Sequence, residues 1–217
     1  SSAASDVYKR QVLNMPFSEE IPTLTPVGIT RWKGEEWITQ RALDTANFTV
    51  EKDALTLCGN GLDLCDRKMQ GLLLVRQQER AFTAETALEI PAAGTAGLTC
   101  YYDEHSYLKF GIGPEGLLLE EYAGYEVVSM QTAPLPASTS HVRLRVTATD
   151  GQRHFAIQDG TDWHTLWSIP EPRYLTSEGL QCGKRFTGAM VGLYVHGASA
   201  VRFADWVAVW PHPEEKR

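Results

Sequence analysis

Acidic side chains are the first candidates for chemistry in this sequence. Hydrolysis of a glycosidic bond without a cofactor needs two carboxyl groups, one acting as acid and one as base or nucleophile. Two pairs of acids lie close together in the chain, Glu85 with Glu89 and Glu120 with Glu121. Neither fits the Glu-x-Asp-x-(x)-Glu strand pattern of a catalytic β-sandwich glucanase, which the chain does not contain. We interpret these acids as solvated strand residues and expect no catalysis by this chain.

Metal ligands are the second kind of candidate. Asp159 and Asp162 could bind Ca²⁺ through oxygen, but two acids fall short of a full shell of ligands, and we favour a hairpin turn here. The six histidines are scattered, and the spacing of Cys58 and Cys65 does not fit a zinc site. We therefore expect no metal and no cofactor.

The four cysteines favour reduced, structural thiols. Cys100 lies in an apolar alternating run, where a thiol packs as a small hydrophobic group. Cys58 and Cys65 flank Gly59-Asn60-Gly61, so a disulfide closing a hairpin is conceivable in an exporting host.

Aromatic residues could bind sugars, because sugar rings stack on aromatic faces. Packing in the core is the commoner role of such residues in a β-sandwich. The candidates for sugar contact are Trp37, Tyr101, Tyr107, Trp163 and Trp167.

The elements that would position these residues are β-strands throughout. Residues His141–Thr149 alternate strictly between apolar and polar, which predicts a half-buried antiparallel strand. Two Asp-Gly turns then predict a three-stranded meander over Val142–Trp167. Further strands are expected at Gly97–Tyr102, Tyr107–Ile112, Gly116–Tyr122, Ala189–His196 and Val201–Trp210. Short strands at this spacing indicate a sandwich or barrel.

Arg76, Gln77 and Gln78 present a problem of parity. In one unbroken strand over Leu72–Ile90, Arg76 would share a face with Leu74 and Phe82. Either a bulge near Glu79-Arg80 resets the register, or Arg76 is buried against a carboxylate or a partner domain. Our sharper hypothesis is that these three residues form a domain interface.

Composition and charge exclude several classes of partner. The chain has 217 residues and a formal net charge of −7, with no run of Lys or Arg, so we expect neither nucleic acid nor an anionic membrane as a partner. No apolar stretch approaches the length of a membrane span. The sequence leaves a homo-oligomer open.

The chain divides into four segments. Residues 1–11 (SSAASDVYKRQ), back-translated with one codon choice, resemble a sequencing-library adapter ending in a transposase recognition end; a disordered native terminus is the alternative. Residues 12–28 are expected to be a linker from an upstream domain, residues 29–211 a β-sandwich domain, and residues 212–217 a tail.

Three stretches together resemble one family. They are Leu74–Glu89 (LVRQQERAFTAETALE), Ala96–Ile112 (AGLTCYYDEHSYLKFGI) and Phe186–Tyr194 (FTGAMVGLY), with Ala204-Asp205-Trp206 in support. They are similar to the C-terminal concanavalin A-like β-sandwich of glycoside hydrolase family 43 β-xylosidases and related arabinofuranosidases. The resemblance implies an all-β, jelly-roll antiparallel sandwich.

The resemblance also implies a function. The parent would be an inverting glycosidase whose five-bladed propeller precedes this module and carries the catalytic carboxylates. The module itself would be non-catalytic, bracing the propeller and shaping the pocket that accepts xylo-oligosaccharides. A free-standing, lectin-like carbohydrate-binding module is the alternative. Scarce cysteines and work on short oligosaccharides indicate the cytoplasm.

Overall fold

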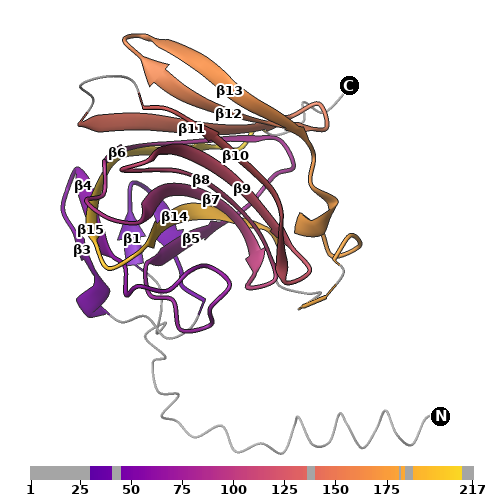
Figure 1. The fold of residues 1–217 in the computed structure, drawn as a ribbon, viewed down its shortest axis with the longest axis horizontal. Helices are drawn as coiled ribbons and strands as arrows, with labels where there is room; N and C mark the ends of the chain where they lie inside the picture. The colour runs from indigo at the N-terminus through magenta and orange to yellow at the C-terminus, as the bar shows by residue number, and fades with distance from the viewer. Residues whose placement is uncertain (1–29, 41–44, 136–139, 181, 184–187, 212–217) are drawn as a thin grey trace, which may run out of the picture.

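Two antiparallel β-sheets packed face to face make up the fold, as the upper and lower layers of Figure 1 show. The computed structural model describes residues 30–40, 45–135, 140–180, 182–183 and 188–211. The predicted all-β sandwich is confirmed, and the helical segments of the described residues are two 3₁₀ turns, η1 (Thr45–Asn47) and η2 (Arg173–Leu175). None of these residues forms a helix long and apolar enough to cross a membrane.

The lower layer has six strands and the upper layer seven. The order in the six-stranded sheet is β10-β9-β8-β7-β14-β5, formed by Glu126–Ala133, Gly116–Ala123, Ser106–Gly113, Thr95–Asp103, Met190–His196 and Leu72–Arg76. The order in the seven-stranded sheet is β13-β12-β11-β6-β15-β4-β3, formed by Asp162–Pro170, Gln152–Asp159, His141–Thr149, Phe82–Glu89, Ala200–Val209, Ala54–Cys58 and Phe48–Val50. A small hairpin, β1 (Thr30–Trp32) with β2 (Glu35–Trp37), pairs separately.

Alternation along each strand sends one set of apolar side chains into the space between the sheets. Leu98, Phe110 and Leu193 from the lower sheet meet Leu144 and Phe203 from the upper sheet, and each is almost fully buried. The core therefore follows directly from the period-two pattern of the sequence.

The predicted meander corresponds to β11, β12 and β13. Asp150 and Gly151 both have positive φ, 50° and 72°, as a two-residue turn between twisted strands requires. A bulge opposite Phe155 and Ala156 adds one residue to β13, which brings Trp167 to the core side while Trp163 stays on the outer side.

The parity problem at Arg76 is resolved by a change of sheet. Strand β5 ends at Arg76 in the lower sheet, and β6 begins at Phe82 in the upper sheet. The expectation of one long strand reset by a bulge was therefore wrong. Within this chain Arg76 is exposed rather than buried against a carboxylate, and its burial against a partner domain stays a prediction. The residues between the strands carry the chain across one end of the sandwich.

Strand β10 is an element that the sequence did not predict. It pairs only with β9, so its other edge is open among the described residues. A bulge at Val128 interrupts its alternation, which removes the period-two signal from the sequence. Its neighbour in the turn, Tyr125, has φ 75°, a backbone conformation that is uncommon for a bulky residue.

Replacing two tryptophans by alanine tests which aromatic residues stabilise the core. Trp37 is fully buried, 4.6 Å from the ring of Trp206, and its indole N–H donates to the Trp32 carbonyl. We expect Trp37→Ala to lower the free energy of unfolding by about 3–5 kcal/mol. The matched variant Trp163→Ala loses a half-exposed ring under Arg145 and should cost about 1 kcal/mol. Urea denaturation measures both, and equal losses would contradict the assignment.

Candidate functional site

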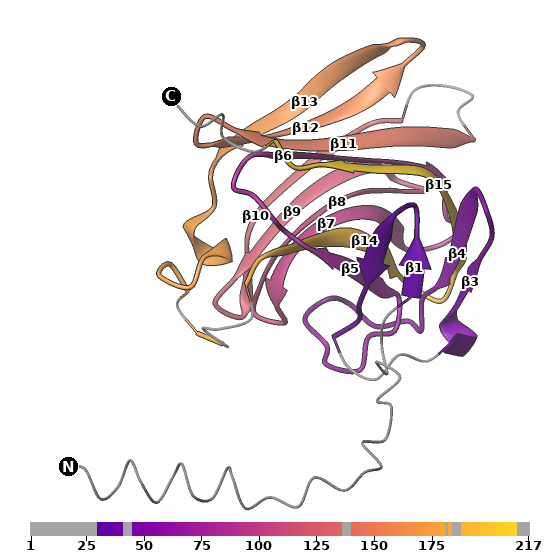
Figure 2. The same cartoon turned by 180° about the vertical axis from the view of Figure 1, so that it is seen from behind.

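The outer face of the six-stranded sheet is covered over half its width. The loop over residues 59–71, between β4 and β5, lies beneath the lower layer in both Figure 1 and Figure 2. Leu64 and Met69 from this loop pack against Leu72 and Leu74 of β5, forming a second apolar cluster outside the sandwich. Consequently the central strands β7 and β8 are buried on both faces.

Three tyrosines stack in a row across this face. Tyr101, Tyr107 and Tyr122 lie opposite one another on β7, β8 and β9. The rings of Tyr107 and Tyr122 are 4.6 Å apart and nearly parallel, and those of Tyr101 and Tyr107 are 6.2 Å apart. Gln40 donates a hydrogen bond to the Tyr101 hydroxyl. Tyr101 and Tyr107 belong to the same apolar cluster as Leu64 and Met69 of the covering loop, so the row forms part of the surface on which the loop packs.

Backbone contacts fix the path of the loop. The carbonyl of Gly71 accepts a hydrogen bond from the Val195 amide, and the Gly61 amide donates to the carbonyl of Gly197. A Cβ at Gly71 would lie 2.3 Å from the Val195 carbonyl oxygen, so this close approach requires glycine. The loop therefore places Asp63 against the outer face of the six-stranded sheet, next to Lys109.

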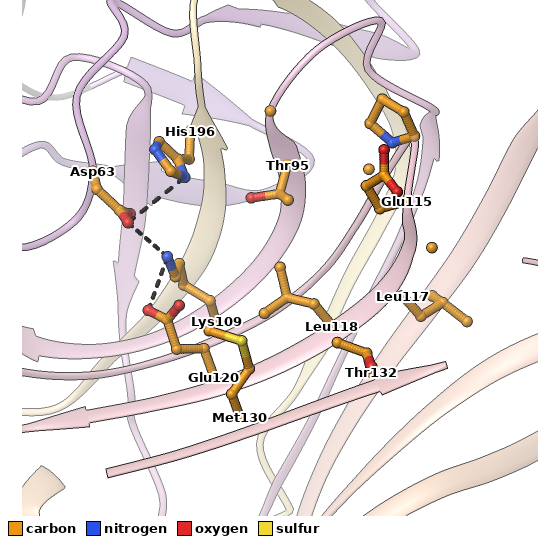
Figure 3. Close-up of a pocket in the computed structure, with 14 residues that line it drawn as sticks. Asp63, Thr95, Lys109, Glu115, Leu117, Leu118, Glu120, Met130, Thr132 and His196 are labelled. Carbon is orange, nitrogen blue, oxygen red and sulfur yellow. Dashed lines mark hydrogen bonds and ion pairs between the residues drawn. The ribbon is translucent and has the colours of Figure 1, made fainter. Parts of the chain in front are cut away.

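A buried ion cluster forms where Asp63 meets the sheet (Figure 3). Lys109 of β8 donates to Asp63 Oδ2 at 2.7 Å and lies 2.9 Å from Glu120 Oε1 on the neighbouring strand β9. Its side chain is only 2 % exposed. His196 Nδ1, at the end of β14, lies 3.6 Å from Asp63 Oδ2. Burial of an ammonium is tolerated here because two carboxylates surround it.

A pocket of about 290 Å³ opens beside this cluster. Figure 3 shows the ion cluster at one end, Glu115 at the other, and Thr95 and Leu118 between them. The Thr95 hydroxyl is buried in the wall of the pocket, where it interacts with the buried Tyr194 hydroxyl. The pocket is lined by Asp63, Gly94, Thr95, Lys109, Gly113, Pro114, Glu115, Gly116, Leu117, Leu118, Glu120, Met130, Thr132 and His196.

This arrangement is suited to recognition rather than acid–base hydrolysis. A glycosidase needs its scissile bond between two carboxyl groups. Here the Lys109 ammonium occupies the position between Asp63 and Glu120 and binds both. Polar groups at one end of a largely apolar hollow are instead typical of a ligand-binding pocket.

A second cavity, of about 470 Å³, lies at one end of the sandwich beside Gln77. Its innermost group, Arg153, is 1 % exposed and forms a bidentate pair with Glu171, with the shortest contact 2.7 Å. The guanidinium also lies 5.4 Å from the centre of the Phe82 ring. We interpret this pair as structural, because Nε and Nη2 of Arg153 both bind the Glu171 carboxylate. Among the described residues Arg153 Nη1 has no hydrogen-bond partner.

The structure separates the aromatic candidates. Trp37 and Trp167 belong to the core, with the Trp167 ring 6.1 Å from that of Phe110. Tyr101 and Tyr107 are buried beneath the covering loop. Trp163 lies on the outer face of the other sheet, where the Arg145 guanidinium covers its ring at 3.7 Å. Four of the five are thus enclosed by protein, and none lines the pocket.

The remaining candidates lie apart from the pocket. Arg76 and Gln78 are exposed at the end of β5, and the half-buried Gln77 donates to the carbonyl of Glu79. Asp159 and Asp162 are exposed at the β12–β13 turn. Among the described residues, no group of three or more His, Cys, Asp or Glu side chains is arranged to bind a metal ion.

All four cysteines have free thiols. Burial raises the pKa of the Cys100 thiol, which therefore stays protonated and packs as the predicted small hydrophobic group.

Of the ion cluster the sequence singled out only Glu120, and the interpretation of this acid as a solvated strand residue was wrong, because its side chain is buried against Lys109. Asp63, Lys109, Glu120 and His196 come from a loop and three different strands. One signal was available: Lys109 shares the face of Tyr107 in a strand flanked by apolar residues, so a buried lysine there needs an acidic partner.

Comparison with known proteins identifies relatives of the fold. A family model described as the β-xylosidase C-terminal concanavalin A-like domain matches residues 33–207. Comparison with curated protein sequences gives no match. Among solved structures, Bacteroides ovatus Xyloglucan PUL GH43B is 21% identical with a TM-score of 0.69, over 83% of this chain and 38% of that chain.

Two further structures differ in how much of their own chain the match covers. Xylan β-1,4-xylosidase from Bacillus halodurans C-125 is 21% identical with a TM-score of 0.68, over 79% of this chain and 36% of that chain. A functionally unknown protein from Saccharomyces cerevisiae is 16% identical with a TM-score of 0.54, over 82% of this chain and 96% of that chain. The chain therefore spans well under half the length of the first two, and nearly all of the third.

The first prediction for this site concerns the buried ammonium. Lys109→Met leaves Asp63 and Glu120 facing each other without a cation, so we expect the free energy of unfolding to fall by about 3 kcal/mol or more. Neutralising the partners as well, with Asp63→Asn and Glu120→Gln, should recover much of that loss. Thermal and urea unfolding test the pair of variants; a triple variant less stable than Lys109→Met would contradict the proposed balance of charges.

The second prediction concerns alkaline pH. Burial, reinforced by nearby acids, raises the pKa of Tyr101 and Tyr107 well above the usual value of 10.0. Above pH 10 these hydroxyls ionise in the unfolded chain but not in the folded one, so stability should fall as pH rises beyond that point. Tyr107→Phe should flatten the fall by up to about 1.4 kcal/mol per pH unit. Tyr125→Phe, at an exposed ring, serves as the control.

Proposed function

Because this chain belongs to the family of β-xylosidase C-terminal concanavalin A-like domains, we propose that it is the non-catalytic accessory module of a family 43-like glycosidase. In this proposal the module docks on a propeller domain that carries the catalytic carboxylates, braces it, and shapes a pocket for xylo-oligosaccharides. The ion cluster is consistent with a non-catalytic role, since its two carboxylates are bound to one buried lysine.

The observation that carries the proposal is an exposed apolar strip along β10. Tyr125, Val127, Val128 and Met130 are between 47 % and 64 % exposed. They lie on a strand edge that pairs with no other described strand, and soluble proteins ordinarily protect such an edge with charges, proline or covering segments. Contiguous exposed apolar residues of this kind mark an interaction surface. The strip is therefore the surface on which we place the catalytic domain.

The outer face of the six-stranded sheet also has polar residues at β5, the edge strand opposite β10. Val127, Tyr122, Tyr107, Tyr101, Met190 and Arg76 follow one another in a single row across the six strands. The exposed Arg76 thus ends the row that Val127 begins, on the opposite edge strand. This placement is compatible with the earlier hypothesis that Arg76, Gln77 and Gln78 contribute to the interface.

Association with the catalytic domain tests the proposal. The catalytic domain of the parent enzyme, produced separately, is titrated with this chain and with the variant Val127→Asp/Met130→Asp. We expect at least a tenfold rise in Kd, because two carboxylates would be desolvated at the interface. The matched control is Val207→Asp/Val209→Asp, two exposed valines on the outer face of the other sheet.

Arg76→Glu provides a second test at the opposite edge. Charge reversal there should also weaken association if the interface spans the whole face. Equal affinity of wild type and the β10 variant, with unfolding midpoints unchanged, would contradict docking through β10. Absence of any association with the catalytic domain would favour a free-standing carbohydrate-binding module instead.

A further inference from the structure

We propose that Asn60 is a site of spontaneous deamidation, and that its conversion to isoaspartate releases the loop over residues 59–71 from the six-stranded sheet. The reacting pair is Asn60-Gly61, at the start of that loop. Glycine hinders attack on a preceding asparagine least, because it has no side chain. The inference concerns this chain alone and does not rest on the docking role.

The Asn60 side chain joins the two ends of the loop. Its Nδ2 donates to the carbonyl of Lys68 at 2.9 Å, and its Oδ1 accepts a hydrogen bond from the amide of Gln70 at 3.2 Å. A side-chain amide supplies a donor and an acceptor together, and a carboxylate supplies acceptors alone. The closure of the loop on itself therefore depends on the amide group of Asn60.

Backbone contacts hold the same end of the loop against the chain that follows β14. The Gly59 amide donates to the carbonyl of Ser199 at 2.9 Å, and the Gly61 amide donates to the carbonyl of Gly197 at 3.2 Å. A Cβ at Gly59 would lie 2.0 Å from the Gly197 carbonyl oxygen, so the two backbones are in direct contact. This end of the loop has no room for an additional main-chain atom.

Deamidation adds such an atom in two steps. The Gly61 nitrogen loses its proton to base and attacks Cγ of Asn60; a C–N bond forms, the Cγ–Nδ2 bond breaks, and Nδ2 leaves as ammonia. Water then opens the resulting five-membered imide at one of its two carbonyl groups. Opening at one carbonyl gives aspartate. Opening at the other gives isoaspartate, in which the main chain runs through the former Cβ and is one atom longer.

The folded structure restrains the first step. The attacking nitrogen of Gly61 is bound to the carbonyl of Gly197, and the amide of Asn60 is held by its own two hydrogen bonds. These bonds must open before the nitrogen reaches Cγ, so the rate follows the population of a locally open loop. The fully buried side chain of Leu64 opposes that opening, because it packs between the loop and the sheet.

Conversion removes the contacts that close the loop. A carboxylate has no donor for the Lys68 carbonyl and places a negative charge beside it. Isoaspartate also lengthens the main chain between Gly59 and Gly61, where both residues bond to the opposite backbone. Asp63 lies in the released segment, so its ion pair with Lys109 is lost as well.

Ageing of the purified chain in mildly alkaline buffer tests the site. Peptides are sequenced by mass spectrometry, and isoaspartate is counted with the methyltransferase that is specific for it. We expect conversion at Asn60 and none at Asn47, because the side chain of Phe48 hinders the attack there. In urea the loop is always open, so conversion should be at least about tenfold faster than in the folded chain. Gly61→Ala in urea should slow it.

Two leucine variants separate local opening from global unfolding. Leu64→Ala removes a buried side chain beneath the loop, and we expect conversion of the folded chain at least about threefold faster. Leu144→Ala removes an equally buried side chain from between the two sheets and should leave the rate unchanged. Circular dichroism confirms folding, and the milder pair Leu64→Val and Leu144→Val replaces any variant that does not fold.

Hydrogen exchange measures the release of the loop. The Val195 amide donates to the carbonyl of Gly71 at 2.8 Å, so its exchange reports whether the loop is seated on the sheet. We expect exchange at least about tenfold faster in the isoaspartate form and at least about threefold faster in Asn60→Asp. The amides of β11, in the other sheet, should not change.

Three outcomes would overturn the proposal. They are no conversion at Asn60 after prolonged ageing of the folded chain, equal acceleration by the Leu64 and Leu144 variants, and unchanged exchange of the Val195 amide in the isoaspartate form. None of them involves a catalytic domain, so this inference and the docking proposal fail separately.

Discussion

Burial of both faces of one sheet is the constraint on which the rest of this structure depends. Strands β7 and β8 pack against the seven-stranded sheet on one side and against the 59–71 loop on the other. A strand in this position cannot leave a polar side chain solvated. Every polar group on its outer face must find a partner within the protein, because an unpaired buried charge is far more costly than an exposed one.

Lys109 shows how that constraint shapes the surroundings. Its ammonium requires counter-charges, and these come from Glu120 on the next strand and Asp63 on the loop. The loop can reach this position because glycines at its ends pack directly against the backbone of the strand end near Val195. The pocket lies beside Asp63, at the place where the loop stops covering the sheet. The position of the loop therefore determines both the ion cluster and the pocket.

The two sides of the outer face therefore differ in character. Near β5 and β14 the sheet is covered and its polar groups are paired within the chain. Near β10 it carries exposed valine and methionine side chains, beside a strand edge that is unpaired within the part of the chain the structure describes. Met130 belongs to both regions, since it lines the pocket and forms part of the apolar strip. A domain docked on β10 would therefore border the pocket.

The amino-acid sequence by itself determined the all-β class, most strands, the three-stranded meander and, through three motifs, the family. These properties depend on neighbouring residues, because side-chain alternation and Asp-Gly turns are local. Tertiary structure alone decided the crossing between sheets after Arg76, the bulged strand β10 and the cluster of Asp63, Lys109, Glu120 and His196. Those features depend on which strands pair and which loop covers them, and strand pairing joins residues whose separation along the chain carries no periodic signal.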